Sequence, residues 1–365
     1  MNRRLVGLVG AGGAVGSAAL AQLRRQADVH VRAGQRRAQR WPDDVEGWVL
    51  DVFDPQALAA FCSGCQVVLN CAGPSWQVGD RVAQAAQAAG AAYVDAFGNA
   101  ALLTALQGAR QPSIIGAGVF PGLTALLPRW MANRGFDRVS SLHIHAGGRE
   151  YCSQAGGADV LLSALGGFGT PNAQWVEGRM QTSPFEQQAQ RLAGFPEAVF
   201  CSAYFTDELQ RLARTLGVPR ASFHNVFDQA QIPALIAASC QRLSQDPSAL
   251  PAAVAQLVHA AELQLLGRRP YYRLSVELSG WRGGQAVRQR AVLSSQDSYG
   301  LSASVAVCAT LQLLRDPSWR GAHWAGDCLM PDDVITAVQA DAACQALSIV
   351  NLAAQTTTAE EEGVL

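Results

Sequence analysis

Four glycines between residues 10 and 16 are the first residues whose type and spacing could do chemistry. The segment reads GAGGAVG, and it lies between an apolar run and an alanine-rich run with helical spacing. Such glycines let a strand turn sharply into a helix and let the backbone approach a diphosphate. The free amides at the start of that helix favour an anion. The sequence therefore predicts a dinucleotide-binding turn at Gly10, Gly12, Gly13, Ala14, Val15 and Gly16.

Basic residues follow in and after the next predicted strand, residues 28–32. An NAD site usually has an acidic side chain here, which binds the ribose 2′-hydroxyl. This chain has Arg32, Arg36 and Arg37 instead, and the forked donors of a guanidinium suit a 2′-phosphate. The alternative is a solvated basic turn. The position relative to the glycines favours a phosphate contact, so NADP(H) is predicted as the cofactor.

Two further strand ends are predicted to line the cofactor, because ligands of a doubly wound sheet bind at the carboxyl ends of its strands. Asp51 is expected near the adenine. The turn after the fourth strand is expected along the nicotinamide ribose. Each of these also fits an ordinary strand-end turn. The residues of that turn are Asn70, Ala72, Gly73 and Pro74.

All 28 basic residues of the chain are arginine. Without lysine, a proton must come from histidine, tyrosine, cysteine or a carboxyl group. The candidates are Tyr151 in a loop at the domain junction, His143 and His145 on the polar side of one strand, and Asp95 at a strand end. The alternatives are histidines on a solvated or subunit-facing surface and an aspartate that caps the following turn.

Nine cysteines include a CxxC pair, Cys62 and Cys65, with Cys71 beyond it. A zinc site needs further ligands at suitable spacing, and a redox pair needs a thioredoxin-like context. An odd number of cysteines without regular spacing is typical of reduced thiols. We therefore predict no metal site.

These residues need a scaffold whose strands end at a common edge. Strands alternate with helices over the first 122 residues, which indicates a doubly wound parallel sheet of six strands. From residue 123 to 299 the strands alternate in polarity, and residues 281–284 give a hairpin signal, as in a mostly antiparallel sheet. From residue 300 we expect helices that return to the first domain, followed by a frayed tail at 356–365.

The bulk composition excludes several classes of protein. The chain has 365 residues, 49% of them hydrophobic, and a formal net charge of −1. That is enough for a large core and two domains, and it gives no bulk attraction to nucleic acid or to an anionic membrane. No apolar run is long enough to cross a bilayer, and no signal-peptide pattern precedes the first strand. We expect a cytoplasmic protein with a small-molecule ligand.

Together these motifs resemble the saccharopine dehydrogenase-like reductases. The resemblance implies an α/β fold, in which an N-terminal NADP-binding Rossmann domain precedes an α+β substrate and dimerisation domain with a mostly antiparallel sheet. The expected boundaries are 1–122, 123–299 and 300–365. The segments that carry the resemblance are GAGGAVG at 10–16, VVLNCAGP at 67–74, AAGAAYVDAFGN at 88–99, GAGVFPGLTALL at 116–127, and GLSASVAVCATLQLL at 300–314 with Gly326 and Pro331.

Within this group the chain looks like a thiazolinyl imine reductase of enantio-pyochelin-type siderophore biosynthesis. The resemblance then implies NADPH-dependent reduction of a thiazoline C=N bond to a thiazolidine, on a substrate tethered to a peptide-synthetase carrier domain, by a homodimer. One alternative is a saccharopine- or opine-type dehydrogenase acting on a secondary amine, whose carboxylate would need an arginine clamp from Arg149, Arg179 or Arg273. The other is a non-catalytic NADP-binding sensor.

Overall fold

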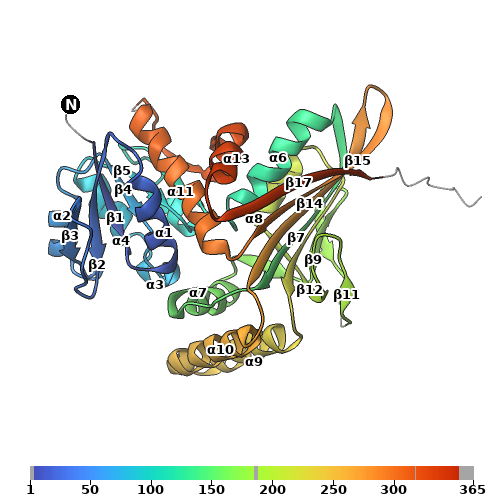
Figure 1. Cartoon of the computed structure of the whole chain (residues 1–365), viewed down its shortest axis with the longest axis horizontal. Helices are drawn as coiled ribbons and strands as arrows, with labels where there is room; N and C mark the ends of the chain where they lie inside the picture. The colour runs from blue at the N-terminus through green and yellow to red at the C-terminus, as the bar shows by residue number, and fades with distance from the viewer. Residues whose placement is uncertain (1–3, 185–187, 317, 353–365) are drawn as a thin grey trace, which may run out of the picture.

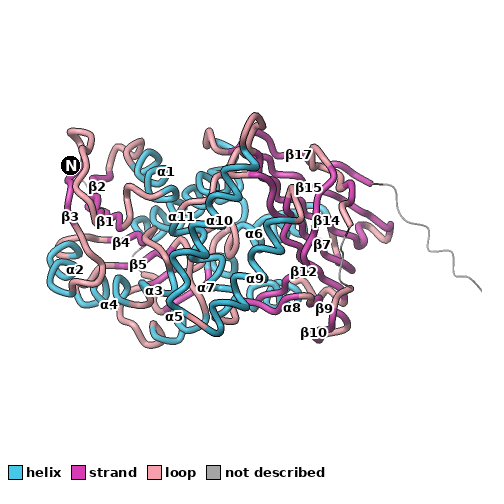
Figure 2. Tube along the Cα trace, turned by 90° about the horizontal axis from the view of Figure 1, so that it is seen from below, coloured by secondary structure: helices cyan, strands magenta, loops and turns pink. Residues whose placement is uncertain are grey.

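The computed structural model describes residues 4–184, 188–316 and 318–352. Two sheets lie at opposite ends of the molecule, with most of the helices between them (Figure 1). In the view from below, strands again occupy both ends and helices the middle (Figure 2). The predicted frayed tail at 356–365 lies outside the described residues.

A parallel sheet forms the N-terminal domain, in the order β16-β6-β5-β4-β1-β2-β3. Its central strands are continuously apolar because helices cover both faces. The predicted doubly wound sheet is confirmed, and β16, from the C-terminal part of the chain, adds a strand next to β6. The strands are β1 (Arg4–Val9), β2 (Val29–Gln35), β3 (Val45–Val49), β4 (Val67–Asn70), β5 (Ala92–Asp95), β6 (Ser113–Ile115) and β16 (Ala322–Trp324).

One of these strands, β2, ends at a later residue than the sequence predicted. β2 continues to Gln35 instead of ending at Arg32, because residues 32–34 still pair with β1 and residues 32–35 with β3. β3 covers Val45–Val49. The helices of this domain are α1 (Ala14–Leu23), α2 (Pro55–Cys62), α3 (Ser75–Val78), α4 (Arg81–Ala88) and α5 (Ala100–Ala105).

A second sheet of ten strands forms the other end, with the path β10-β9-β13-β7-β14-β15-β17 and with β8, β11 and β12 paired beside it. All its pairs are antiparallel except that of β13 with β7, so the predicted mostly antiparallel α+β domain is confirmed. The strands are β7 (Arg138–Arg149), β8 (Gly169–Pro171), β9 (Ala173–Val176), β10 (Arg179–Thr182), β11 (Gln190–Arg191), β12 (Ala198–Thr206), β13 (Arg220–Phe227), β14 (Tyr271–Arg282), β15 (Gln285–Ser295) and β17 (Cys344–Leu352).

One continuous apolar core joins the two sheets. Helices α6 (Leu123–Gly135), α8 (Asp207–Thr215), α11 (Ser298–Arg315), α12 (Ala325–Cys328) and α13 (Pro331–Ala340) contribute to it or pack against it. A smaller cluster joins α7 (Gln154–Leu165) to α9 (Gln231–Gln245) and α10 (Leu250–Leu265), with the short 3-10 helix η1 (Pro247–Ala249) between the last two. None of the described helices combines the length and the apolar character that crossing a bilayer requires.

Helix α11 brings the C-terminal part of the chain back to the first domain. It packs beside α1, and Gln22 Nε2 donates to Ser304 Oγ at 3.0 Å in the buried contact. Arg4 at the start of β1 donates to the carbonyl of Leu314 near the end of α11. Helix α11 therefore runs opposite to β1, and its first turn lies at the carboxyl edge of the sheet.

The sequence suggested that the chain after residue 300 forms helices, but this part also contains strands. Strand β17 pairs with β15 at the edge of the second sheet, from Ser295 opposite Cys344 to Arg288 opposite Leu352. Without β17, the edge of β15 would leave a row of unpaired backbone groups. The segment after residue 300 therefore contributes to both domains.

Candidate active site between the two domains

The glycine turn is tightly constrained by its surroundings. Gly10 has φ +77°, and a Cβ there would lie 2.7 Å from the backbone nitrogen of Ala72. A Cβ on Gly16 would overlap the carbonyl oxygen of Gly10. Both positions therefore need glycine for close packing between β1, β4 and α1, as the sequence predicted.

The start of α1 has the features of a diphosphate cradle. The helix begins at Ala14, and its N-cap residue is Gly13, which supplies no side-chain capping bond. Gly12 is exposed, and a Cβ on Gly13 would meet only the carbonyl oxygen of Gly10, at 3.2 Å. The first amides of α1 therefore lack a side-chain partner and suit a diphosphate. The amide of Gly12, just before them, donates to Gln35 Oε1 at 3.2 Å.

The residues at the end of β2 suit the 2′-phosphate of NADP. Gln35 is the last residue of β2, where an NAD site usually has an acidic side chain. Arg36 and Arg37 follow it directly and are exposed. With a neutral amide at the strand end and two cations beyond it, this edge favours a phosphate over a hydroxyl.

The structure does not bring Arg32 to this edge. Arg32 lies inside β2, where its Nε is 3.1 Å from Glu46 Oε1. Its Nη1 donates to the carbonyls of Phe61 and Ser63, each at 2.7 Å, and its guanidinium lies over Trp48. The strand is longer than expected, so these neighbours occupy the side chain of Arg32. Its contact with the cofactor stays a prediction that this arrangement disfavours.

The other predicted cofactor residues lie at the carboxyl edge of the sheet. Asp51 is exposed just after β3 and accepts a bond from the amide of Phe53. Asn70 ends β4, accepts from the amide of Ala72 and donates to Asp95 Oδ2 at 3.1 Å. The contacts of these residues with a bound cofactor remain a prediction.

Asp95 is buried at the end of β5, next to Asn70 and Tyr93. It accepts bonds from Asn70, the hydroxyl of Tyr93 and the amide of Phe97. Burial raises the pKa of its carboxyl. Asp95 is 3% exposed, and its bonds to Asn70 and Tyr93 hold the ends of β4 and β5 together. Its catalytic role stays a prediction.

Helix α7 of the second domain packs on the turn after β4. Asp159 Oδ1 accepts from the amide of Ser75 at 2.6 Å and from its hydroxyl at 2.7 Å. Trp76 Nε1 donates to Ser163 Oγ at 2.9 Å. A Cβ on Gly73 would lie 2.9 Å from Asp159 Oδ2, so this glycine allows the close contact. Burial raises the pKa of Asp159 to about 6.

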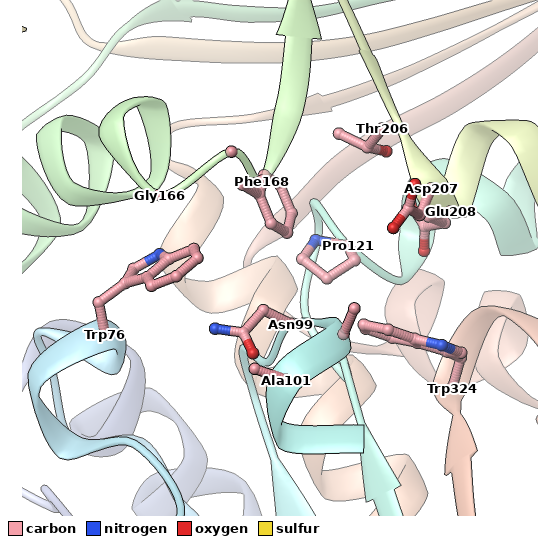
Figure 3. A pocket seen from close by; sticks show the side chains of 12 residues that line it. Trp76, Asn99, Ala101, Pro121, Gly166, Phe168, Thr206, Asp207, Glu208 and Trp324 are labelled. Atoms are coloured by element: carbon pink, nitrogen blue, oxygen red, sulfur yellow. The ribbon is translucent and has the colours of Figure 1, made fainter. Parts of the chain in front are cut away.

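A cavity of about 190 Å³ lies beyond this contact, between the two domains (Figure 3). Trp76, Asn99 and Pro121 enter it from the carboxyl edge of the parallel sheet, and Phe168 and Glu208 from the second domain. The cavity therefore lies at the β4, β5 and β6 end of the cofactor edge. The full lining is Trp76, Asn99, Ala100, Ala101, Pro121, Gly166, Gly167, Phe168, Thr206, Asp207, Glu208 and Trp324.

Glu208 is the lining residue with an acid-base property near neutrality. It is buried in the first turn of α8, and burial raises its pKa to about 7. Its Oε1 accepts from the amide of Gly122 and its Oε2 from the hydroxyl of Thr124, both at 2.6 Å. These two bonds favour the carboxylate and partly offset the effect of burial. The group can therefore hold or release a proton near pH 7.

Tyr151 lies on the other side of the α7 contact. Its side chain is 51% exposed, and its carbonyl accepts from the hydroxyl of Tyr299 at 3.1 Å. The neighbouring Glu150 accepts from the amide and the hydroxyl of Ser298 and so holds the start of α11; burial raises its pKa to about 7. Tyr151 is thus near the cofactor edge but does not line the cavity, and its catalytic role remains a prediction.

The two predicted histidines are not brought to the cleft. Leu142, Ile144 and Ala146 of β7 face the core that the helices share, so His143 and His145 lie on the opposite side of the sheet. His143 Nδ1 is 2.9 Å from Ser222 Oγ, and His145 stacks on a histidine of β13. Burial lowers the pKa of both, to about 3 for His145. Because side chains alternate along β7, the two histidines share the face of the strand that points away from the core and the cofactor domain.

The three arginines considered as a carboxylate clamp lie elsewhere. Arg149 is buried and donates to Asp228 at 2.7 Å. Arg273 donates to the carbonyls of Tyr272 and Ser295. Arg179 is exposed at the start of β10. None of the three is among the residues that line the cavity.

Only part of the cavity lining lies where local sequence patterns place ligand contacts. Trp76 and Asn99 lie just after strand ends, where ligand contacts are expected. Phe168, Glu208 and Asp159 had no local signal, because their role depends on how α7 and α8 pack against the first domain. No three described His, Cys, Asp or Glu side chains are grouped in a way that could hold a metal.

Residues 6–113 match the family model described as the saccharopine dehydrogenase NADP binding domain. NADP(H) is thereby confirmed as the cofactor, and the glycine cradle and the arginines after β2 fit it. No sequence among the curated proteins matches the chain.

Solved structures show the same overall fold. Saccharopine dehydrogenase (L-Glu forming) from Saccharomyces cerevisiae is 15% identical, with a TM-score of 0.67 over 96% of this chain and 100% of that chain. DAP dehydrogenase from C. glutamicum is 15% identical, with a TM-score of 0.51 over 92% and 96%. The NADP-binding domain and this two-domain fold identify an NADP-dependent oxidoreductase.

Proposed function

We propose that the protein is an NADPH-dependent reductase of a C=N bond, and that its substrate is a thiazolinyl imine on a peptide-synthetase carrier domain. The observation that carries this proposal is the lining of the interdomain cavity. It presents the rings of Trp76, Phe168 and Trp324 and the carboxyl groups of Asp207 and Glu208, and none of its described lining residues is basic. A flat ring without a negative charge fits this lining, because aromatic side chains pack on its face.

The same lining disfavours an amino-acid substrate. An α-carboxylate needs a cationic partner, and arginine is the usual one. Arg149 and Arg273 are bound to other groups, and Asp207 would repel a carboxylate in the cavity. A saccharopine- or opine-type substrate carries such carboxylates, so the imine is favoured. That the structures similar to this chain include a saccharopine dehydrogenase and a DAP dehydrogenase supports chemistry at a carbon–nitrogen bond.

The cofactor would be held by the amides at the start of α1 and by Arg36 and Arg37. NADPH, when bound, supplies the hydride for the carbon of the C=N bond. The protein must then place the ring and provide one proton for the nitrogen. Trp76 and Phe168, on opposite domains, would hold the ring between them and keep water out.

Glu208 is the proton donor that best fits the cavity. Burial keeps its carboxyl group protonated up to about pH 7, and the group lines the space that the substrate would fill. Once the proton has moved to the nitrogen, the bonds from the Gly122 amide and the Thr124 hydroxyl stabilise the carboxylate that remains. The C=N bond thereby becomes CH–NH. Tyr151 is the second candidate.

The test is an assay of NADPH absorbance with two sets of substrates. We expect oxidation of NADPH with thiazolinyl thioesters of small thiols, and faster oxidation with the same acyl group on its carrier domain. Oxidation only with an oxo acid and an amine or amino acid would contradict the imine assignment. Tight NADPH binding without turnover of either set would indicate a sensor. The carrier domain and a second copy of the chain are the partners that belong to this proposal.

A further inference from the structure

We infer a second ligand site, an arginine-lined cavity beside the substrate cavity that binds a phosphate ester. The arginine cavity has a volume of about 250 Å³ and lies between α6, α8 and α12. Three guanidinium groups in it face a single carboxylate, so its charge suits an anion. Its lining residues are Arg129, Arg211, Leu212, Arg214, Thr215 and Asp327.

The contacts of the three arginines leave binding capacity for a ligand. Arg129 donates to the carbonyl of Gly326 at 2.5 Å, which does not neutralise its charge. Arg211 Nε donates to Asp327 Oδ2 at 2.8 Å, whereas its Nη2 is buried without a hydrogen-bond partner in the described parts of the chain. Arg214 is exposed, and its guanidinium lies 5.2 Å from the ring centre of Trp175.

A buried N–H group without a partner is uncommon in proteins, and a ligand oxygen would satisfy it. An anion suits the cavity, because its lining has three arginines and one carboxylate, Asp327. A phosphate ester has several oxygens and can bind two arginines at once, and guanidinium groups match its geometry. The hydroxyl of Thr215 lines the same cavity and can add a donor.

The arginine cavity lies next to the substrate cavity. Glu208 and Arg211 are three residues apart on α8, which places them roughly 4.5 Å apart along the helix axis. The guanidinium of Arg211 lies 4.6 Å from the ring centre of Trp324, and Trp324 lines the substrate cavity. The two cavities are therefore neighbours on either side of the Arg211–Trp324 contact. We infer that one long ligand reaches both, with its reactive ring in one and a phosphate in the other.

A carrier-bound substrate has this form, because the phosphopantetheine arm carries a phosphodiester beyond its thioester. This identity of the ligand rests on the proposed function. The arginine cavity would then bind the phosphate of the arm and position the imine. It would distinguish a carrier-bound substrate from the free acid.

Calorimetry of the protein saturated with NADP+ tests the site without turnover. The probes are phosphopantetheine, pantetheine and inorganic phosphate. We expect phosphopantetheine to bind at least tenfold more tightly than pantetheine, since charge-assisted contacts are lost without the phosphate. Arg214→Gln should remove this preference, and Arg242→Gln, on the exposed part of α9, should keep it.

Equal affinity for phosphopantetheine and pantetheine would overturn the inference, as would a preference that survives Arg214→Gln. Inorganic phosphate that binds as tightly as phosphopantetheine would assign the cavity to free phosphate and so overturn the assignment to the arm. If the preference is present and depends on Arg214, but no thiazolinyl substrate is reduced, the site stands and the proposed reductase function fails.

Discussion

The glycine turn and the interdomain cavity are two parts of one site, but they are built in opposite ways. The turn consists of consecutive residues between β1 and α1, and its shape follows from Gly10 and Gly16, where a side chain would strike the backbone. The cavity takes its lining from α3, α5, α8, β16 and the loops beside α6 and α7. A change at the open face of the turn should therefore affect cofactor binding, and one at Gly10 or Gly16 the fold as well. Changes in the cavity should affect the chemistry or the contact between the domains.

The largest expected effect is the loss of NADPH binding in Gly13→Val. A Cβ at Gly13 would have one close contact, at 3.2 Å, so the fold should tolerate the change while the added methyl groups fill the space for the diphosphate. Losing two or more charge-assisted bonds should weaken NADPH binding by roughly a hundredfold or more. Binding is measured by cofactor fluorescence, with circular dichroism to check the fold.

Gly16→Val is the matched control within the turn. Its side chain would overlap the carbonyl of Gly10, so this variant should lose folded protein as well as cofactor binding. If Gly13→Val binds NADPH as tightly as the unchanged protein, the turn has only a structural role.

The second prediction concerns the proton donor in the cavity. Glu208→Gln keeps the shape of the side chain but removes the exchangeable proton, so kcat should fall by roughly 10² to 10⁴ while NADPH affinity stays within about a factor of two. In the unchanged protein the acid must be protonated, so kcat should fall as pH rises above about 7. That limb of the pH profile should be absent in Glu208→Gln.

Two variants serve as controls for this prediction. Asp207→Asn changes the exposed neighbour on the same helix and should leave the pH profile unchanged. Tyr151→Phe removes the hydroxyl on the other side of the α7 contact. A large fall of kcat in Tyr151→Phe, with Glu208→Gln close to normal, would transfer the role of proton donor to Tyr151.

The contrast between the two regions also explains what the sequence could predict. The parallel sheet, the glycine turn and the cofactor follow from local patterns, because strand, turn and helix residues are consecutive. Arg32 was misplaced because the end of β2 depends on pairing with β1 and β3, which begin and end far away in the chain. His143 and His145 were correctly paired on one side of β7, but which side faces the cofactor domain depends on the helices packed against it.

Two residues of the interdomain region, Glu208 and Asp159, lay beyond such patterns. Burial raises the pKa of Glu208, and the bond from the Gly122 amide, in the loop before α6, partly offsets that rise. Asp159 matters because the middle of α7 meets the amide of Ser75, 84 residues earlier. No property of either residue's own segment indicates these contacts.

The third prediction returns to the cofactor end, with a smaller effect. Arg36→Ala combined with Arg37→Ala should raise the KM for NADPH at least tenfold and leave the KM for NADH almost unchanged, because only NADPH has the 2′-phosphate. Each charge-assisted contact contributes about 1.5 to 3 kcal/mol. Arg32→Ala is the control, since its side chain is bound to Glu46 and to two carbonyls. Equal losses for both cofactors would contradict the assignment of these arginines.

The smallest expected effect concerns the contact that assembles the cavity. The pKa of Asp159 is raised by burial from 3.8 to about 6 in the folded protein, so the folded state binds its proton more tightly than the unfolded state. Folded stability is therefore lost as pH rises from about 4 to about 6, and the loss is complete above that range. A shift of this size corresponds to at most roughly 3 kcal/mol.

Asp159→Asn should remove this loss and keep the contact, because the amide oxygen can still accept from the amide and the hydroxyl of Ser75. Its Tm should equal that of the unchanged protein near pH 4 and exceed it by roughly 3 to 6 °C at pH 8. Asp207→Asn should show no such pH-dependent difference. If the Tm of Asp159→Asn differs from that of the unchanged protein by the same amount at both pH values, the folded protein does not raise the pKa of Asp159. Asp159→Ala, which cannot accept from Ser75, should instead lower the Tm at every pH and reduce turnover, because α7 would no longer fix Trp76 in the cavity wall.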